Sequence, residues 1–244
     1  MDDPVYAVGD IHGQLEQLEE ALRRIEADGG PEARVVFLGD YVDRGPQSAG
    51  TLARLRAGLA EGRPWHCLVG NHDLMFLRFV REGQQHDRRI LSGNGWLTPP
   101  LGGRATLASY GVDLAPGRPV EMIAGEAARR VPEADLAFVE SLPRRLDTPA
   151  RLFVHAGVRP GVPLDRQDPD DLVWIRDGFL EHPAPWPKLV VHGHTALPEP
   201  AHFGPRVDLD GGAGYGRELL PAVFEGERVW LLNARGRRRL LPPG

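Results

Sequence analysis

Residues 35–44 are Val35-Val36-Phe37-Leu38-Gly39-Asp40-Tyr41-Val42-Asp43-Arg44, an apolar run that passes through one glycine into a charged cluster. Four other segments also place Asp, Asn or His directly after an apolar run, namely 5–12, 68–73, 152–157 and 189–195. In open parallel sheets, ligands collect beyond the carboxyl ends of the strands. The five clusters therefore predict one shared site at a sheet edge, with side chains that can bind metal ions.

The apolar pattern alternates between strand and helix over much of the chain. Short apolar runs predict strands at 5–8, 34–38, 65–69, 151–154 and 189–191. Leucines at three- and four-residue steps predict helices at 15–25, at 52–59 and from 74 onward. This alternation predicts an α/β fold with parallel strands and crossover helices.

Other parts of the chain depart from that alternation. Segment 82–131 is rich in Gly, Pro and Arg, and we expect it to form a cap insertion within a single domain spanning 1–244. A helix at 134–142 should close the cap. Near the end, apolar runs predict a β-meander at 206–209, 219–224 and 228–232. We expect the basic end, 235–239, to be solvated.

The composition, 41% hydrophobic and 26% charged, is that of a soluble globule. A net charge of -5 argues against nonspecific nucleic-acid binding. The single cysteine, Cys67, is expected to be a small buried apolar residue. The start Met1-Asp2-Asp3-Pro4 lacks signal-peptide features, and no apolar run reaches membrane-spanning length, so we expect a cytoplasmic protein without membrane contact.

The five clusters supply the ligand types of a two-metal site. Carboxylates and imidazoles suit Mn²⁺, Zn²⁺ or Fe, of which we expect Mn²⁺ first. Two cations about 3.5–4 Å apart need a bridging carboxylate and a bridging water or hydroxide. Asp10 and His12 can reach one ion, and Asp40 is the natural bridge. Asn71, His155 and a histidine of the last cluster can hold the other ion.

The same clusters offer groups for phosphate chemistry. A metal-bridging hydroxide can attack phosphorus in line, and guanidinium forks such as those of Arg44 and Arg176 match phosphoryl oxygens. His72 is placed to donate a proton to the departing alkoxide, with Asp43 holding its other ring nitrogen. An ion pair with Asp177 is the alternative role for Arg176.

Five motifs in this order resemble those of the phosphoprotein phosphatase family of calcineurin-like metallophosphoesterases. They lie at 9–13, 39–45, 70–73, 155–157 and 193–195. The resemblance implies a four-layer α/β/β/α sandwich with a small cap insertion and two bound divalent metal ions.

The resemblance also implies a role for each matching residue. The implied ligands of the first metal are Asp10, His12 and Asp40, and those of the second are Asp40, Asn71, His155 and His194. The implied phosphate-binding residues are Arg44, Arg176 and Asn71, and the implied general acid is the His72–Asp43 pair.

Segments 157–163 and 171–176 resemble bacterial serine/threonine protein phosphatases. The first hypothesis is therefore a phosphatase acting on phosphoserine, phosphothreonine or phosphotyrosine in proteins or peptides. The second is a symmetrical dinucleoside tetraphosphate hydrolase acting on a small phosphoester, which would need aromatic side chains that stack on a base. Trp96 and Tyr110 are the aromatic residues that the cap offers for this. A non-catalytic binding module is the third hypothesis, but every ligand position carries a competent residue.

Several residues near the motifs have plainer explanations. For His192, packing within the fold is the first choice, ahead of metal or substrate contact. Asp73 is expected to steady a ligand loop. Trp96 is at least as well explained as a core aromatic residue. The remaining histidines are treated as surface or structural, namely His66, His86, His182 and His202.

Overall fold

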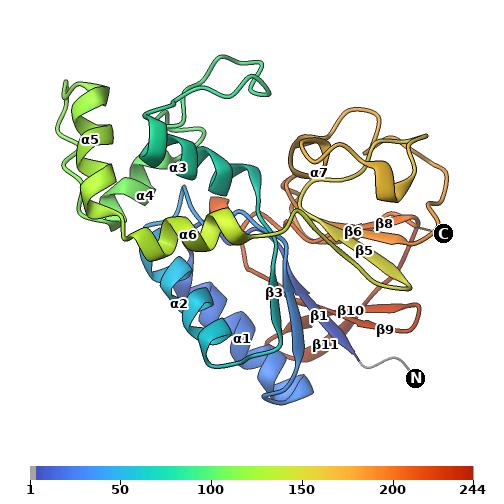
Figure 1. Ribbon diagram of the computed structural model, residues 1–244. Helices are drawn as coiled ribbons and strands as arrows, with labels where there is room; N and C mark the ends of the chain where they lie inside the picture. Colours follow the sequence, from blue (N-terminus) through green and yellow to red (C-terminus); the bar gives the residue numbers. More distant parts are fainter. Residues whose placement is uncertain (1–3, 244) are drawn as a thin grey trace.

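The computed structural model describes residues 4–243, whose strands form two sheets that share an apolar core (Figure 1). Residues 1–3, the start used for the signal-peptide argument, lie outside this range. The first sheet has the order β11-β10-β9-β1-β2-β3 and consists of β1 (Val5–Val8), β2 (Arg34–Phe37), β3 (Trp65–Cys67), β9 (Ala222–Glu225), β10 (Arg228–Asn233) and β11 (Gly236–Leu240). The second has the order β4-β5-β6-β8-β7 and consists of β4 (Arg145–Asp147), β5 (Arg151–Val154), β6 (Leu189–His192), β7 (Ala201–His202) and β8 (Arg206–Asp208).

Helices cover the outer faces of the two sheets. The helices are α1 (Leu15–Gly29), α2 (Ser48–Ala60), α3 (Asn71–Glu82), α4 (Gly103–Ser109), α5 (Val120–Arg130), α6 (Glu133–Ser141) and α7 (Asp171–Trp174), with short 3₁₀ turns η1 (Leu164–Arg166) and η2 (Ala213–Tyr215). In Figure 1, α1 and α2 lie along the first sheet, whereas α7 lies beside the second. This arrangement confirms the α/β/β/α sandwich that the resemblance implied.

Side-chain alternation along the strands builds these layers. Ala7 of β1 faces the second sheet and belongs to the same apolar cluster as Phe153 and Val191. Its neighbour Tyr6 faces the other way, into the core with Leu18 and Leu22 of α1. The second sheet has its own outer core against α7. The strands therefore bury both faces, as their nearly continuous apolar runs require.

The parallel arrangement predicted from the sequence is confirmed. β1 pairs in parallel with β2, and β2 with β3. In the second sheet, β5, β6 and β8 are also parallel. The carboxyl ends of β1, β2, β3, β5 and β6 lead directly into the five polar clusters.

The predicted meander is wrong in its first strand. Run 206–209 forms β8, which pairs with β6 in the second sheet, with Val207 opposite Val191. The meander is instead β9-β10-β11. An apolar run predicts that a strand exists but not which strand it pairs with, because pairing in a two-sheet sandwich depends on the path of the intervening chain.

The basic end, 235–239, is solvated as predicted, since residues 235–238 are exposed and Arg239 is half-buried. The strand that it forms was not predicted. Residues 236–240 form β11, which pairs with β10 and buries Leu240. Arg237 forms ion pairs with Asp28 and Glu225, and Arg239 lies over the ring of Trp230. Consecutive arginines hide the strand pattern, although charged residues suit an exposed edge strand.

Segment 82–131 contains α4 and α5, two helices that its irregular composition did not predict. α4 is short and begins at a glycine, and the buried face of α5 consists of Ile123, Glu126 and Ala127. A charged residue on that face weakens the apolar period. Ile123 and Ala127 nevertheless belong to the same core as α1–α3. No helix in residues 4–243 combines the length and apolarity needed to cross a bilayer.

Candidate metal and phosphate site

The predicted metal-binding residues come together in the structure and are almost completely buried. They are Asp10, His12, Asp40, Asn71, His155 and His194, each 6% exposed or less. They follow the ends of β1, β2, β3, β5 and β6, so parallel pairing within each sheet and stacking of the sheets bring them to one place.

The backbone of these loops is held in an unusual conformation. In residues 4–243, five non-glycine residues have positive φ, namely His12, Asp40, Asp43, Arg44 and His194. All five are residues that the sequence assigned to the site. A left-handed conformation costs on the order of 1–3 kcal/mol for a non-glycine residue and persists only where neighbours enforce it. The conformational strain is thus located at the residues whose side chains must point into the proposed metal site.

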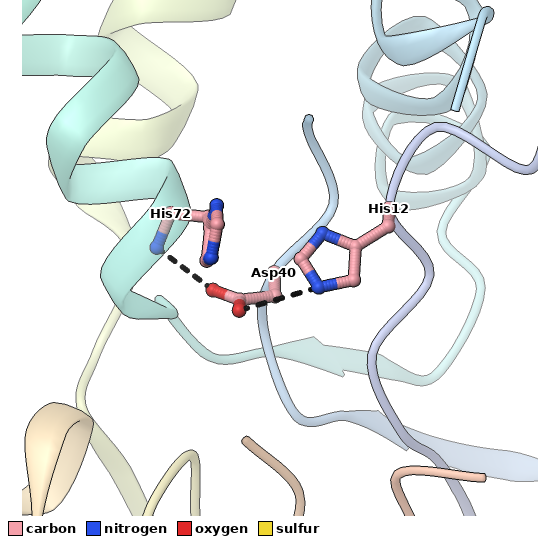
Figure 2. Close-up of side chains that lie close together, drawn as sticks. All are labelled: His12, Asp40 and His72. Carbon is pink, nitrogen blue, oxygen red and sulfur yellow. Dashed lines mark hydrogen bonds and ion pairs between the residues drawn. The ribbon is translucent and has the colours of Figure 1, made fainter. Parts of the chain in front are cut away.

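Asp40 lies at the centre of the cluster. Its Oδ2 is 3.7 Å from His12 Nε2, and its Oδ1 is 3.4 Å from His155 Nε2. Asp10 Oδ2 lies 3.9 Å from the same nitrogen of His12. Figure 2 shows the Asp40 carboxylate between the His12 ring and the start of α3, where the His72 backbone N–H donates to Asp40 Oδ1 at 2.9 Å. One carboxylate oxygen therefore faces each side of the cluster.

The second side of the cluster brings acceptors together. Asn71 Oδ1 lies 2.9 Å from His155 Nε2 and 2.8 Å from His194 Nδ1. His155 Nδ1 lies 2.9 Å from the Leu38 carbonyl, so that nitrogen carries the ring proton and Nε2 presents a lone pair. A lone pair and an amide oxygen that face each other at this distance fit a shared cation.

His12 is oriented in the same way. Its Nδ1 lies 2.8 Å from the Val42 carbonyl, so Nε2 presents its lone pair to Asp10 and Asp40. A carbonyl that fixes the tautomer of a metal-binding histidine is a recurrent supporting contact. Sequence reasoning missed the carbonyls of Val42 and Leu38, because every residue has a carbonyl and none gives a sequence signal.

The electrostatics of the cluster also fit divalent cations. Burial, together with repulsion from Asp210 and Asp40, raises the pKa of Asp10 well above its ordinary value. Burial and the nearby Asp73 likewise raise the pKa of Asp40. Burial lowers the pKa of His155 to about 3, so this ring offers a lone pair rather than positive charge. Buried carboxylates beside neutral imidazoles need positive charge, which metal ions can supply.

Two groups of three side chains have the spacing of metal ligands, and they share Asp40. One is His12, Asp40 and His72, and the other is Asp40, His155 and His194. The first group contains His72, which was not a predicted ligand, and does not contain Asp10, which was. Asp10 lies beside the group, with its Oδ2 3.9 Å from His12 Nε2. Asp40 common to both groups is the arrangement that a bridging carboxylate requires.

His72 and Asp43 form a buried pair. His72 Nδ1 is 2.6 Å from Asp43 Oδ2. The same carboxylate accepts a hydrogen bond from Trp96 Nε1 at 2.7 Å and one from the Thr106 hydroxyl at 2.7 Å. Burial raises the pKa of Asp43 to about 7, and these two donors oppose that rise. Trp96 is fully buried, which agrees with the core assignment, but sequence reasoning missed its bond to Asp43.

The two predicted phosphate-binding arginines lie on one groove with a volume of about 620 Å³. Arg44 Nη2 is 3.2 Å from His72 Nε2, and its Nη1 contacts His12 Nε2. Arg176 donates from Nη2 to the His194 carbonyl at 3.2 Å, which holds its guanidinium at the site. Asn71 and His72 line the same groove. The groove is therefore basic where it meets the buried cluster.

The supporting residues lie as predicted. Asp73 accepts hydrogen bonds from the backbone N–H groups of Asp40, Tyr41 and Gly70 at 2.8–2.9 Å, which confirms that it steadies the ligand loops. His192 is buried, with its ring 4.9 Å from that of Phe179, which confirms packing. Cys67 is also buried, as predicted.

The turn η2 is a part of the site that sequence reasoning missed. A Cβ added at Gly214 would lie 2.6 Å from His12 Cδ2 and 3.0 Å from Arg44 Cδ. The next residue, Tyr215, is 59% exposed, and the Arg44 guanidinium lies 4.8 Å from its ring centre. The glycines around this tyrosine could have drawn attention to a close backbone approach.

A family model described as calcineurin-like phosphoesterase matches residues 3–217. The chain belongs to this family. Its His and Asp groups fit the dinuclear metal centre that this family uses.

Relatives with two activities are similar to parts of this chain. A symmetrical bis(5'-nucleosyl)-tetraphosphatase of Janthinobacterium sp. (strain Marseille) is 44% identical over 30% of this chain and 25% of its own. One of Paracidovorax citrulli (strain AAC00-1) is 33% identical over 74% of this chain and 49% of its own. Serine/threonine-protein phosphatase 1 of Salmonella typhimurium is 38% identical over 38% of this chain and 40% of its own. The chain thus matches less than half the length of each relative.

Solved structures share the fold across nearly the whole chain. That of a candidate diadenosine tetraphosphatase has a TM-score of 0.64 at 23% identity and covers 98% of this chain and 94% of its own. That of a cold-active protein tyrosine phosphatase has a TM-score of 0.62 at 18% identity and covers 99% and 81%. At these identities the likeness shows the fold alone.

Proposed function

We propose that this metallophosphoesterase removes phosphate from phosphorylated side chains of proteins, with serine and threonine phosphates as the first substrates and tyrosine phosphate as a further one. The observation that carries this proposal is the His72–Asp43 pair, which sits beside Arg44 at the base of an open groove. An alkoxide leaving group needs a proton, and such a pair can supply it.

In this proposal the buried side chains of the site would hold two divalent metal ions. Asp10, His12 and Asp40 would hold one divalent ion, and Asp40, Asn71, His155 and His194 the other, with Mn²⁺ as the first choice. When bound, two such ions lower the pKa of a shared water, so that hydroxide is available near neutral pH.

The other groups would act on the substrate directly. Arg44, Arg176 and Asn71 would hold the phosphate oxygens, where two guanidinium forks offset the negative charge. His72 would give a proton from Nε2 to the departing oxygen. Asp43, bonded to Nδ1, would stabilise the imidazolium before transfer. Segment 82–131 is in this proposal the cap of a single domain, and it contributes Trp96 to this pair.

Two contacts in that segment support a protein substrate over a dinucleotide. Trp96 is fully buried against Phe79 and bonded to Asp43, so it is engaged in the core. Tyr110 stacks on Phe76, and its hydroxyl donates to Asp135 at 2.9 Å. The two aromatic residues that the cap offers for stacking on a base are therefore already packed and hydrogen-bonded within the protein.

Symmetrical dinucleoside tetraphosphate hydrolysis is the second candidate function. The named activity of the Janthinobacterium and Paracidovorax relatives favours it. Tyr215 adds a structural reason, because its half-exposed ring lies beside Arg44 and could stack on a base.

A substrate panel with Mn²⁺ would test the proposal. It would compare phosphoserine, phosphothreonine and phosphotyrosine peptides with diadenosine tetraphosphate by their kcat/KM values. We expect a higher value for the phosphopeptides. The Asp40→Asn variant, purified in parallel, controls for contaminating phosphatases. A strong preference for the dinucleotide would reject the first function in favour of the second.

A further inference from the structure

The groove that holds Arg44 and Arg176 continues beyond them. One wall is the long loop between α3 and α4, which contributes Arg88 and Arg89. The opposite wall consists of α7 and its flanking segments. In Figure 1 this loop projects from the end of α3 on the same side of the molecule as α7. A substrate whose phosphate lies at the buried cluster would therefore extend between these walls.

Ion pairs connect the two walls but leave donors free. Arg88 Nη2 lies 3.0 Å from Asp170 Oδ2, and the Arg88 side chain is 82% exposed. Arg89 Nη1 lies 3.3 Å from Asp171 Oδ1, whose carboxylate also accepts two bonds from Arg159 at 2.6 and 2.8 Å. A guanidinium has five N–H donors, and each loop arginine uses one in these contacts. The Arg88–Asp170 pair is largely exposed and stabilises little, so a second carboxylate can join or replace it. Asp171 is buried and is also held by Arg159, so a substrate carboxylate would join Arg89 through its free N–H donors.

The lining of the groove has a clear excess of positive charge. Five arginines line it against Asp171 and Asp177, and Asp170, which pairs with Arg88, adds a third carboxylate beside them. Arg44 and Arg176 are assigned to the phosphate, and Arg159 is committed to Asp171. The scissile phosphate does not require Arg88 and Arg89, and each keeps N–H donors free beyond its one contact with an aspartate. An anionic group next to that phosphate would complement them.

Apolar surface beside these arginines favours a peptide as the occupant. Leu91 follows them directly and is 95% exposed, and Ile90 and Trp174 line the same groove. A peptide offers both apolar and acidic side chains, which match the apolar residues and the arginines of this groove together.

We propose that Arg88 and Arg89 form a subsite for carboxylate side chains that flank the phosphorylated residue of a protein substrate. The subsite deepens the proposed phosphatase function and depends on it. It would make the enzyme select phosphorylation sites in acidic sequence surroundings.

The test uses phosphothreonine peptides of equal length with glutamate, alanine or lysine at the two positions on each side of the phosphothreonine. With the full chain and Mn²⁺, we expect kcat/KM to be about three- to tenfold higher for glutamate than for alanine flanks, mainly through KM, since exposed charge contacts are individually weak. Arg88→Glu with Arg89→Ala should reverse the order in favour of lysine flanks. Added salt should reduce the preference.

A matched control is Arg23→Ala, because Arg23 is an exposed arginine of α1 that pairs with Glu20 away from the groove. It should keep the glutamate preference. An equal rate on all three flanks in the wild-type enzyme, or equal losses on all peptides in the Arg88/Arg89 variant, would overturn the subsite. No hydrolysis of any phosphopeptide, with rapid hydrolysis of diadenosine tetraphosphate, would instead reject the protein-phosphatase function and the subsite together.

Discussion

Removing the hydrogen bond from Trp96 to Asp43 tests the proposed proton-donating pair, His72 and Asp43. Trp96→Phe removes the indole N–H, which lies 2.7 Å from Asp43 Oδ2, and keeps most of the aromatic volume. A hydrogen bond to a charged group contributes roughly 1.5–3 kcal/mol. At 1.36 kcal/mol per unit, its loss would raise the pKa of Asp43 by about one to two units. The starting value is already about 7 because the carboxylate is buried.

The sign of the effect on turnover follows from that shift. A higher pKa keeps Asp43 protonated at neutral pH, so it would no longer stabilise the charged form of His72. We expect kcat for a phosphothreonine peptide to fall about 5- to 50-fold at pH 7, because the ionised fraction of Asp43 falls from about one half to about 1–10%. Raising the pH through the new pKa should restore part of the loss, because Asp43 then ionises.

The assay compares two leaving groups. A phosphothreonine peptide releases an alkoxide that needs a proton, whereas p-nitrophenyl phosphate releases a stable phenolate. The loss should therefore be large for the peptide and small for the aryl ester. Thermal unfolding of the variant is measured in parallel, and the assay is run well below its melting temperature, so that unfolding does not contribute to the loss. An equal loss on both substrates, or none on the peptide, would refute the role given to this bond.

Trp230→Phe is the matched control for this experiment. In residues 4–243 the buried indole nitrogen of Trp230 has no hydrogen-bond partner. Trp230 lies in β10, an outer strand of the first sheet. The same substitution there should leave both rates unchanged, because it removes no bond to Asp43.

Three further predictions concern the cluster itself. Asp40→Asn should reduce bound metal, measured by elemental analysis, from two ions per chain to fewer than one; two retained ions would contradict the bridging role. Asp73→Asn should weaken metal binding about 10- to 100-fold in calorimetric titration and lower the melting temperature, since an amide cannot accept three backbone N–H groups. Gly214→Ala should slow turnover by displacing His12, whereas Gly125→Ala, with only an arginine 3.8 Å away, should not; equal rates would contradict the close approach.

The positions of the predicted site residues followed from the sequence because strand ends impose them. Asp40 and His155 are far apart in the chain, yet each follows a parallel strand, one in the first sheet and one in the second. Parallel strands deliver their carboxyl ends to one edge of a sheet, and stacking of the two sheets brings the two edges together. Asp73 was predictable for a similar reason, since it lies two residues after the proposed ligand Asn71 at the start of α3. Such inferences need residue type, order and local pattern only.

Other features depended on contacts that no local pattern carries. Trp96 reaches Asp43 from a segment whose composition gave no helix or strand, and Thr106 does so from a helix that was not predicted. Placing β8 beside β6 requires knowledge of how the chain crosses the sandwich. Arg88 and Arg89 belong to none of the motifs, and their position opposite α7 is the basis of the role proposed for them.

The strained loops that carry the proposed ligands are tied to one another by hydrogen bonds. The Asp40 carbonyl accepts bonds from the backbone N–H groups of Ile11 and His12 at 3.1 and 2.8 Å, so the first two ligand loops are tied together through their backbones. Asp73 ties the second loop to the third. Because these bonds hold Asp40 in its left-handed conformation, metal affinity should depend on this hydrogen-bonded frame as much as on the proposed ligands. Substitutions in the frame should therefore weaken metal binding while every ligand remains present.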